Sequence, residues 1–289
     1  MKKKTTDYIF EGSIFILLAF LMVITLIPFL HLIAISFSAD WAVVSGRVGV
    51  FPVDFQWETM KVVVTNATFL KAFMNSAFVT SVGTALSLIL TAIVAYPLSK
   101  RSLPGLSVFM VLFIFTMMFN GGIIPNYLLI KNIGLLNNLF ALILPSLLNV
   151  FNLLVIKSYY ESIPEALEES AYIDGAGIMT ILWRIIIPVS GPVLATMALF
   201  YAVAYWNDFF QAMLYINKPA LKPLQLYLRD LVLMADDTSL MLSPEDRMNV
   251  PAEGLRAATV IAATLPIVVL YPLLQRHFVK GVMIGSVKG

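Results

Sequence analysis

The stretch "EALEESAYIDGAGIMTILWRIIIP", residues 165–188, decides how this chain is understood, because its start differs sharply from its surroundings. The chain is 60% hydrophobic, yet four of its seventeen carboxylates lie within residues 165–174. Two glycines follow the carboxylates, and an apolar run then ends at a proline. The residues concerned are Glu165, Glu168, Glu169, Asp174, Gly175, Gly177 and Pro188.

The rest of the chain has the composition of a membrane protein. Only 12% of its residues are charged and its mean hydropathy is +0.88, whereas globular domains contain about 25% charged residues. The net charge of +2 is too small to indicate nucleic-acid binding. We therefore expect the basic residues to mark the ends of apolar segments at lipid interfaces.

Cysteine and histidine usage excludes several kinds of chemistry. The chain has no cysteine, which excludes disulfides, thiolate metal sites, iron–sulfur clusters and a cysteine nucleophile within it. Its two histidines, His31 and His277, are far apart in the sequence. We therefore predict no metal site.

Apolar stretches of the length that crosses a membrane occur six times. A helix needs about 20 apolar residues to span the hydrocarbon core. The first stretch follows a basic start and is longer than the core of a signal peptide, so we interpret it as a retained helix. Internal proline and glycine in the third and fourth stretches are tolerated in a bundle. The sequence predicts an all-α polytopic membrane protein with transmembrane helices at 12–36, 76–99, 107–127, 138–157, 191–213 and 257–277.

The distribution of basic residues orients these six helices. The only short connection on the opposite side, 128–137, holds Lys131 alone, so the positive-inside rule places both termini in the cytoplasm of a cell membrane. Residues 158–190 then form a cytoplasmic loop, and residues 214–256 form an outer segment. The basic residues at the cytoplasmic ends are Lys2, Lys3, Lys4, Lys100, Arg101, Lys157, Arg184, Arg276, Lys280 and Lys288.

The acidic part of the loop has the pattern of a short capped helix. Ser162 and Glu165 are in the relation of a capping box, with Pro164 in the first turn, so we expect the helix to start there. Gly175 can adopt a left-handed conformation and end this helix before a second one begins near Gly177.

Helical geometry groups the side chains of this short helix into two faces. Three interpretations remain open: a solvated pair of helices, a docking surface for a soluble partner, or paired-carboxylate catalysis. The last is weak because no cleft, base or metal partner is evident. At 100° per residue, Glu161, Glu165, Glu168, Glu169 and Tyr172 fall on one face, and Leu167, Ser170 and Ala171 on the other.

The segment resembles the cytoplasmic "EAA" loop in the permease subunits of binding-protein-dependent ABC importers. The family pattern is E-A-A, three residues, a glycine, nine residues, and I-x-L-P. Two positions depart from it, Ser170 and Ile187, and both exchanges preserve a helix–turn–helix. The matching positions are Glu169, Ser170, Ala171, Gly175, Ile185, Ile187 and Pro188.

The resemblance implies a type I ABC importer permease fold and a loop that docks into an ATPase subunit. Glu169, Ala171 and Gly175 would make the central contacts, with Glu165 and Glu168 assisting and Pro188 completing the motif. The resemblance also implies a second, different permease subunit, two ATPase subunits, an extracytoplasmic solute-binding protein and a carbohydrate substrate. Because the sequence contains no phosphate-binding loop, ATP and magnesium would bind to the partner ATPase subunits and not to this chain.

The resemblance covers nearly the whole chain and is closest to the carbohydrate-uptake type. The tail "GSVKG" is similar to that of the maltose-type subunit, which implies that Val287, Lys288 and Gly289 reach toward the interface between the ATPase subunits. Residues 118–138 and 199–216 resemble permeases for oligosaccharides of complex polysaccharides, such as pectic or alginate fragments. We divide the chain into an N-terminal helix and outer segment (1–75), a permease core (76–277) and a cytoplasmic tail (278–289).

Polar and aromatic residues near the outer end of the fifth predicted span are candidates for the substrate pathway. An ionisable residue within a membrane is costly and therefore a functional candidate, although aromatic residues also gather at the lipid interface. Both interpretations remain open here. The candidates are Tyr205, Trp206, Asn207, Asp208 and Phe209, with Asn120, Asn126 and Asn149 as weaker ones because interhelical hydrogen bonding is the usual use of asparagine in a bundle.

The main alternative function is a stand-alone secondary transporter driven by an ion gradient. Such a protein would have internal repeats and several deep ionisable residues, and only Asp208 approaches this description. An intramembrane enzyme would need a catalytic group of residues, which the sequence does not offer. The outer segment 214–256 suggests contact with a binding protein or a simple surface connection, and its acidic residues lack the spacing of a calcium-binding EF-hand loop.

Overall fold

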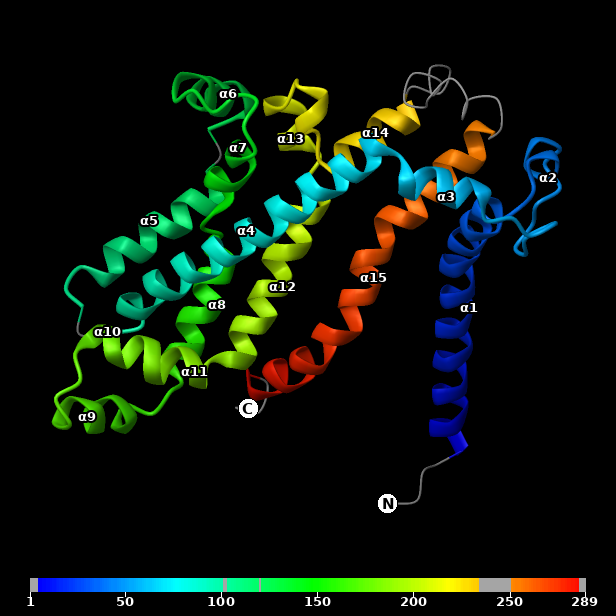
Figure 1. Ribbon diagram of the computed structural model, residues 1–289. Coiled ribbons are helices and arrows are strands. Elements are labelled where there is room, and N and C mark those ends of the chain that lie inside the picture. The colour runs from blue at the N-terminus through cyan, green and yellow to red at the C-terminus, as the bar shows by residue number, and fades with distance from the viewer. Residues whose placement is uncertain (1–4, 101–102, 120, 234–250, 286–289) are drawn as a thin grey trace. The chain divides into compact units, whose positions relative to one another are not determined.

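A computed structural model describes residues 5–100, 103–119, 121–233 and 251–285 of the chain (Figure 1). The described residues form helices and loops, with no β-strand among them. They divide into two compact units. The first combines the described parts of residues 1–70 and 230–265, and the second combines 71–229 with the described residues from 266 onward.

The first unit contains a long, lipid-facing helix. Helix α1 has 32 residues and is about 48 Å long, more than the roughly 30 Å of a hydrocarbon core. Apolar side chains are exposed along its length, as lipid solvation requires, and residues Phe10–Ser36 confirm the first predicted span. The helices that begin in this unit are α1 (Thr5–Ser36), α2 (Asp40–Val44), α3 (Glu58–Thr65), α4 (Ala67–Leu98) and α15 (Ala252–Gly285).

A small lobe follows α1 in the segment predicted to lie outside the membrane. The backbone amide of Gln56 donates to the carbonyl of Phe37 at 2.9 Å. The Phe37 ring stacks on Phe55 at a centroid distance of 5.5 Å and on Trp57 at 5.2 Å. These contacts join the chain just after α1 to residues 55–57 and so close the lobe.

The second unit is a helical bundle with a core at each end. One core gathers Tyr96, Leu153, Ile156 and Leu182, where α4, α8 and η2 meet. The other gathers residues of α7, α12 and α13, including Tyr205. Helices α9 to α11 lie at one end of this bundle, and α6, α7 and α13 lie at the opposite end (Figure 1). The bounds are α5 (Leu106–Met118), α6 (Ile123–Asn132), α7 (Phe140–Ile143), η1 (Leu144–Ser146), α8 (Val150–Glu161), α9 (Ala166–Ile173), α10 (Ile178–Ile181), η2 (Leu182–Ile186), α11 (Ile187–Val189), α12 (Gly191–Asn207), α13 (Phe210–Tyr215), η3 (Pro219–Leu221) and α14 (Leu224–Leu233).

The third predicted span, 107–127, is not one helix. Helix α5 has 13 residues and is about 20 Å long, too short to cross the hydrocarbon core alone. Helix α6 starts at Ile123, after Gly122, whose φ of +94° lies outside the helical region. Only glycine adopts such a conformation without strain. The two helices reach the length and apolarity of a span only when taken together.

The fourth and fifth predicted spans are also interrupted. Between η1 and α8 the chain bends by 50°, and Asn149 caps the new helix by accepting the amide of Asn152 at 3.1 Å. Helix α12 ends at Asn207 instead of continuing to residue 213, and α13 then starts at Phe210. The Asp208 carboxylate accepts the Gln211 amide at 3.1 Å, which favours a new turn over continuation of α12.

The membrane-spanning count agrees with the predicted fold class when bent pairs are counted as single spans. Among the described residues, α1, α4 and α15 each contain a segment long and apolar enough to cross a membrane. Three bent pairs raise the number to six. The all-α fold class is confirmed, and the six-span count holds when three of the spans are formed by bent helix pairs.

Candidate functional site

The loop between α8 and α12 folds as a helix–turn–helix. Helix α9 ends in a Schellman motif, in which the Ala176 amide donates to the Ala171 carbonyl at 2.9 Å and the Gly175 amide donates to the Tyr172 carbonyl at 3.0 Å. Gly175 has φ +79°, which confirms the left-handed turn expected there. We call residues 162–190 the coupling loop, after the role that the family resemblance implies for them.

The predicted capping box is not formed. Ser162 ends α8, and its hydroxyl donates to the carbonyl of Tyr159 at 2.7 Å. Helix α9 begins at Ala166, with Glu165 at the N-cap position and no side-chain cap. Because its hydroxyl serves the end of the preceding helix, Ser162 does not cap the start of the next.

The predicted division of α9 into two faces is also wrong. Glu168 and Ala171 are buried together, as residues three apart on a helix share a face. Glu165 and Glu169 are exposed, and so is Leu167, which was predicted to share a face with the buried Ala171. No local sequence pattern indicated that one carboxylate has a partner elsewhere in the chain.

That partner lies at the end of α4. The Lys100 ammonium group forms an ion pair with Oε1 of Glu168. The Tyr96 hydroxyl donates to Oε2 of the same carboxylate at 3.1 Å. Lys100 Nζ also lies 4.8 Å from the centroid of the Tyr96 ring, within range of a cation–π interaction. We call these three residues the clamp.

An acidic groove runs beside the clamp. It has a volume of about 610 Å³ and is lined by the clamp residues Lys100 and Glu168 and by the exposed carboxylates Glu165 and Glu169, among others. Glu161 also lines it and pairs with Lys157 within α8 at 2.7 Å. With Glu168 neutralised by Lys100, the exposed carboxylates give the groove its negative charge.

The coupling loop also exposes apolar side chains. Ile173 is 87% exposed, and Ile178 and Met179 at the start of α10 are also exposed. Exposed apolar side chains that gather on one segment are typical of sites of protein association. Further along, the π-helical turn η2 precedes Pro188, which has no amide hydrogen to donate.

A polar pocket of about 510 Å³ lies between α8, α12 and the turn after η1. Of the predicted pathway residues, it is lined by Tyr205, Asn207, Asp208 and Asn149. Two candidates from the fifth predicted span do not line it: Trp206 is buried and packs on Phe73 with the ring centroids 5.8 Å apart, and Phe209 lies outside. Further polar and aromatic lining residues were not predicted, because they come from two segments far apart in the sequence: Ser146, Phe151, Asn152, Phe200, Tyr201 and Gln211.

The Tyr205 side chain serves the structure as well as the pocket. Its hydroxyl bonds to Ser87 Oγ at 2.9 Å and donates to the Ile143 carbonyl at 3.3 Å. The neighbouring Tyr201 hydroxyl bonds to Thr91 at 2.7 Å. These bonds connect α4 to α12 inside the bundle, so the two tyrosine hydroxyls are engaged in helix packing.

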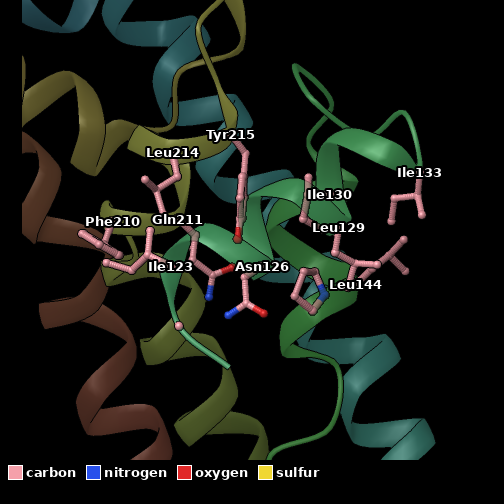
Figure 2. A pocket seen from close by; sticks show the side chains of 12 residues that line it. Ile123, Asn126, Leu129, Ile130, Ile133, Leu144, Phe210, Gln211, Leu214 and Tyr215 are labelled. Carbon is pink, nitrogen blue, oxygen red and sulfur yellow. The ribbon is translucent and has the colours of Figure 1, made fainter. Parts of the chain in front are cut away.

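A second pocket, of about 610 Å³, lies nearer the outer end and contains the predicted residue Asn126 (Figure 2). The side chains of Asn126, Gln211 and Tyr215 point into the same space between apolar walls (Figure 2). Gln211 lines both pockets, and its Nε2 donates to Ser146 at 3.1 Å. Its Oε1 is buried without a hydrogen-bond partner among the described residues. Gln211 therefore joins the two pockets and leaves one acceptor available.

Several predicted residues lie outside the described part of the chain. They include the pathway candidate Asn120 and the tail residues Val287, Lys288 and Gly289. The basic residues Lys2, Lys3, Lys4 and Arg101 used for orientation also lie outside it.

Bent apolar helices with pockets between them and a helix–turn–helix loop at one end are features of a membrane transport subunit. Residues 76–284 match the family described as "Binding-protein-dependent transport system inner membrane component", and the chain belongs to this family. It is therefore a multi-pass permease of an ABC importer with the type I permease fold, and not an ion-driven secondary transporter.

Relatives and a solved structure agree with this family. The chain is 46% identical to Protein LplC of Bacillus subtilis over 266 residues, covering 92% of this chain and 90% of that protein. It is 40% identical over 290 residues to the polygalacturonan/rhamnogalacturonan transport system permease protein YtcP of the same organism, with both chains fully covered. A crystal structure of a bacterial ABC transporter that imports the acidic polysaccharide alginate matches with a TM-score of 0.89 at 32% identity, covering 96% of this chain and 99% of that one.

Proposed function

We propose that this chain is one of two different permease subunits that together form the path of an oligosaccharide across the cell membrane. Two separate ATPase subunits, which bind ATP and magnesium, drive the transport. An extracytoplasmic binding protein delivers the substrate at the outer end, where the segment 214–256 contributes to its docking. The observation that carries the proposal is the coupling loop, a helix–turn–helix with an acidic groove and exposed apolar side chains.

The surface of the coupling loop is better suited to contact with a soluble partner protein than to exposure to water. Ile173, Ile178 and Met179 expose apolar surface beside a negatively charged groove. A partner with an apolar contact and a basic side chain would cover the first and neutralise the second. We assign Glu165 and Glu169 to this contact, with Gly175 and Ala171 holding the shape of α9 and Pro188 at its stem.

The proposed arrangement in the membrane follows from the two ends of the bundle. The coupling loop faces the cytoplasm, where ATPase subunits reside, together with both chain termini. Basic residues near that end, such as Lys100 and Arg184, support this orientation. The tail residues Val287, Lys288 and Gly289 reach the interface between the two ATPase subunits.

The two pockets support a sugar as the substrate. Side-chain amides of Asn126, Asn149 and Gln211 offer hydrogen bonds to hydroxyl groups within an otherwise apolar bundle. Phe151 and Phe200 stack with their ring centroids 6.3 Å apart and line the same pocket. They offer an aromatic surface to the apolar face of a sugar ring. We place Asn207 and Asp208 on this path, with Tyr205, Trp206 and Phe209 shaping its outer end.

The names of the relatives narrow the substrate class. One relative serves polygalacturonan and rhamnogalacturonan, and a matching structure serves alginate. All three of these substrates are polysaccharides, so we propose that this importer carries an oligosaccharide released from a complex polysaccharide.

Co-purification of the chain with its partner subunits, followed by reconstitution in proteoliposomes, tests the proposal. The binding protein is loaded in turn with uronic and neutral oligosaccharides, and ATP hydrolysis and uptake are measured together. We expect at least one loaded oligosaccharide to stimulate both activities. Uptake by this chain alone, driven by a proton or sodium gradient without ATP, would contradict the proposal.

A further inference from the structure

Two adjacent carboxylates in α9 have different environments. Glu169 is exposed on the coupling loop, whereas Glu168 is 9% exposed and points toward α4. Neighbouring residues on a helix are rotated by about 100° from one another, so one can face a partner while the other faces the bundle. Both oxygens of Glu168 have a hydrogen-bond donor within this chain.

We infer that Glu168 is a positioning residue that acts inside the permease and does not contact the ATPase subunit. The Lys100–Tyr96–Glu168 clamp joins α9 to the end of α4, so that the two helices move as one body. This inference rests on the proposed function, in which α9 receives the motion of the ATPase subunits. It names the connection through which that motion enters the membrane.

Two contacts from one carboxylate restrain α9 more completely than one would. Lys100 follows the end of α4 at Leu98, and Tyr96 lies in the last turn of the same helix. A single ion pair would allow α9 to pivot about it. The second bond, from the Tyr96 hydroxyl to the other carboxylate oxygen, restrains that rotation, and the Tyr96 ring supports the Lys100 ammonium group.

Apolar packing places the clamp at a junction of three helices. Ala171 of α9, Tyr96 of α4 and Tyr160 of α8 belong to the same buried cluster. The Tyr96 and Tyr160 rings meet edge to face at 6.4 Å. The ion pair is therefore shielded from water on one side, and a buried carboxylate that loses its partner is strongly disfavoured.

Open space lies on both sides of the clamp. The acidic groove is on one side, and a cavity of about 580 Å³, lined by apolar residues such as Pro97, Leu103 and Ile178, is on the other. Lys100 and Glu168 line both spaces. Together with the packing of Ala171 and Tyr96 in the buried cluster, the clamp holds α9 against the end of α4.

The test uses the complete importer in proteoliposomes, with this chain, its partner permease, the ATPase subunits and the loaded binding protein. Two quantities are measured: retention of the ATPase subunits during purification, and ATP hydrolysed per oligosaccharide imported. We expect Glu168→Gln and Lys100→Met to retain the ATPase subunits but to raise the ATP cost of each imported molecule about tenfold. Lys100→Arg preserves the charge and should keep the wild-type ratio.

An exchanged pair separates positioning from a failure to fold. Lys100→Glu combined with Glu168→Lys restores the ion pair and should recover at least half of the lost coupling. Lys157→Met serves as the control, because Lys157 pairs with Glu161 within α8 and connects no two helices. This variant should change neither quantity.

Three results would overturn the inference. They are loss of ATPase subunits from Glu168→Gln to the extent seen for Glu169→Lys, an unchanged ratio in the single variants, or an exchanged pair no better than either single variant. Failure of the proposed function is recognised separately. In that case the wild-type importer shows no ATP-dependent uptake, or Glu169→Lys keeps its ATPase subunits.

Discussion

At the scale of single residues, Gly175 shows how one backbone conformation shapes the coupling loop. Its φ of +79° closes the Schellman motif that ends α9 and redirects the chain toward α10. A Cβ at this position would meet no atom within 4 Å, so space is not the constraint. The left-handed conformation itself is unfavourable for other residues by about 1–2 kcal/mol.

Gly175→Ala is therefore expected to destabilise this turn by about 1–2 kcal/mol through the backbone alone. Hydrogen exchange of the Ala176 amide, which donates to Ala171, measures that change as faster exchange. Gly177→Ala is the matched control, because Gly177 has φ −73° and equally open surroundings. Equal effects of the two substitutions would contradict this explanation.

The sequence predicted Gly175 correctly and the environment of Glu168 incorrectly, for a physical reason. A glycine after a helical pattern is a local signal, set by the conformations open to that residue. The burial of Glu168 depends on Lys100, which lies 68 residues earlier in the chain. The capping box failed in the same way, since the Ser162 hydroxyl bonds back to Tyr159 in the preceding helix.

At the scale of helices, close approach between α4 and α12 depends on a missing side chain. A Cβ at Gly83 in α4 would lie 2.8 Å from the ring of Tyr205 in α12. The ring cannot easily move away, because the Tyr205 hydroxyl is bonded to Ser87 and to the Ile143 carbonyl. This contact explains why a glycine is found within a long apolar helix.

Gly83→Ala should consequently destabilise the bundle by about 1–3 kcal/mol, the usual cost of overpacking. The opposite sign would follow from helix propensity alone, which favours alanine by about 1 kcal/mol. Gly191→Ala provides the control, because a Cβ there meets nothing within 4 Å. Unfolding of the purified chain in detergent, followed by circular dichroism, distinguishes the two outcomes by the direction of the midpoint shift.

Substitutions of Asp208 test what breaks the chain between α12 and α13. Its Oδ1 accepts the Gln211 amide, and an asparagine oxygen can do the same. Asp208→Asn should therefore preserve the fold, whereas Asp208→Ala should lose about 1 kcal/mol with the cap. Midpoints of thermal unfolding compare the two variants, and an equal loss in both would show that the charge, and not the cap, matters.

Hydropathy could not predict where the helices are interrupted. The apolar runs at residues 107–127, 138–157 and 191–213 have the length of a span, but hydropathy does not separate a straight helix from a bent pair. Gly122 interrupts the first of these runs through its backbone conformation, and side-chain bonds of Asn149 and Asp208 compete with helix continuation in the other two. A further bend, of 82°, lies between Val189 and Gly191. Polar residues within apolar runs were the available signal.

At the scale of the whole molecule, composition and the coupling-loop motif were sufficient to predict the class of protein. The all-α, six-span architecture and the permease family follow from apolar length and from the spacing of Glu169, Gly175 and Pro188. The pockets could not be predicted in full, because their lining comes from α6, α8, α12 and α13 together. Only the folded bundle brings Asn126 and Gln211 into one space.

The central claim is that the coupling loop docks the ATPase subunits, and Glu169→Lys tests it most directly. The exposed Glu169 carboxylate lines the acidic groove, so reversing its charge should repel the basic partner surface without disturbing the clamp. The measurement is recovery of ATPase subunits with the purified importer, at matched yields of the two permease subunits. We predict at least a tenfold loss of bound ATPase subunits, and recovery equal to wild type would contradict the account.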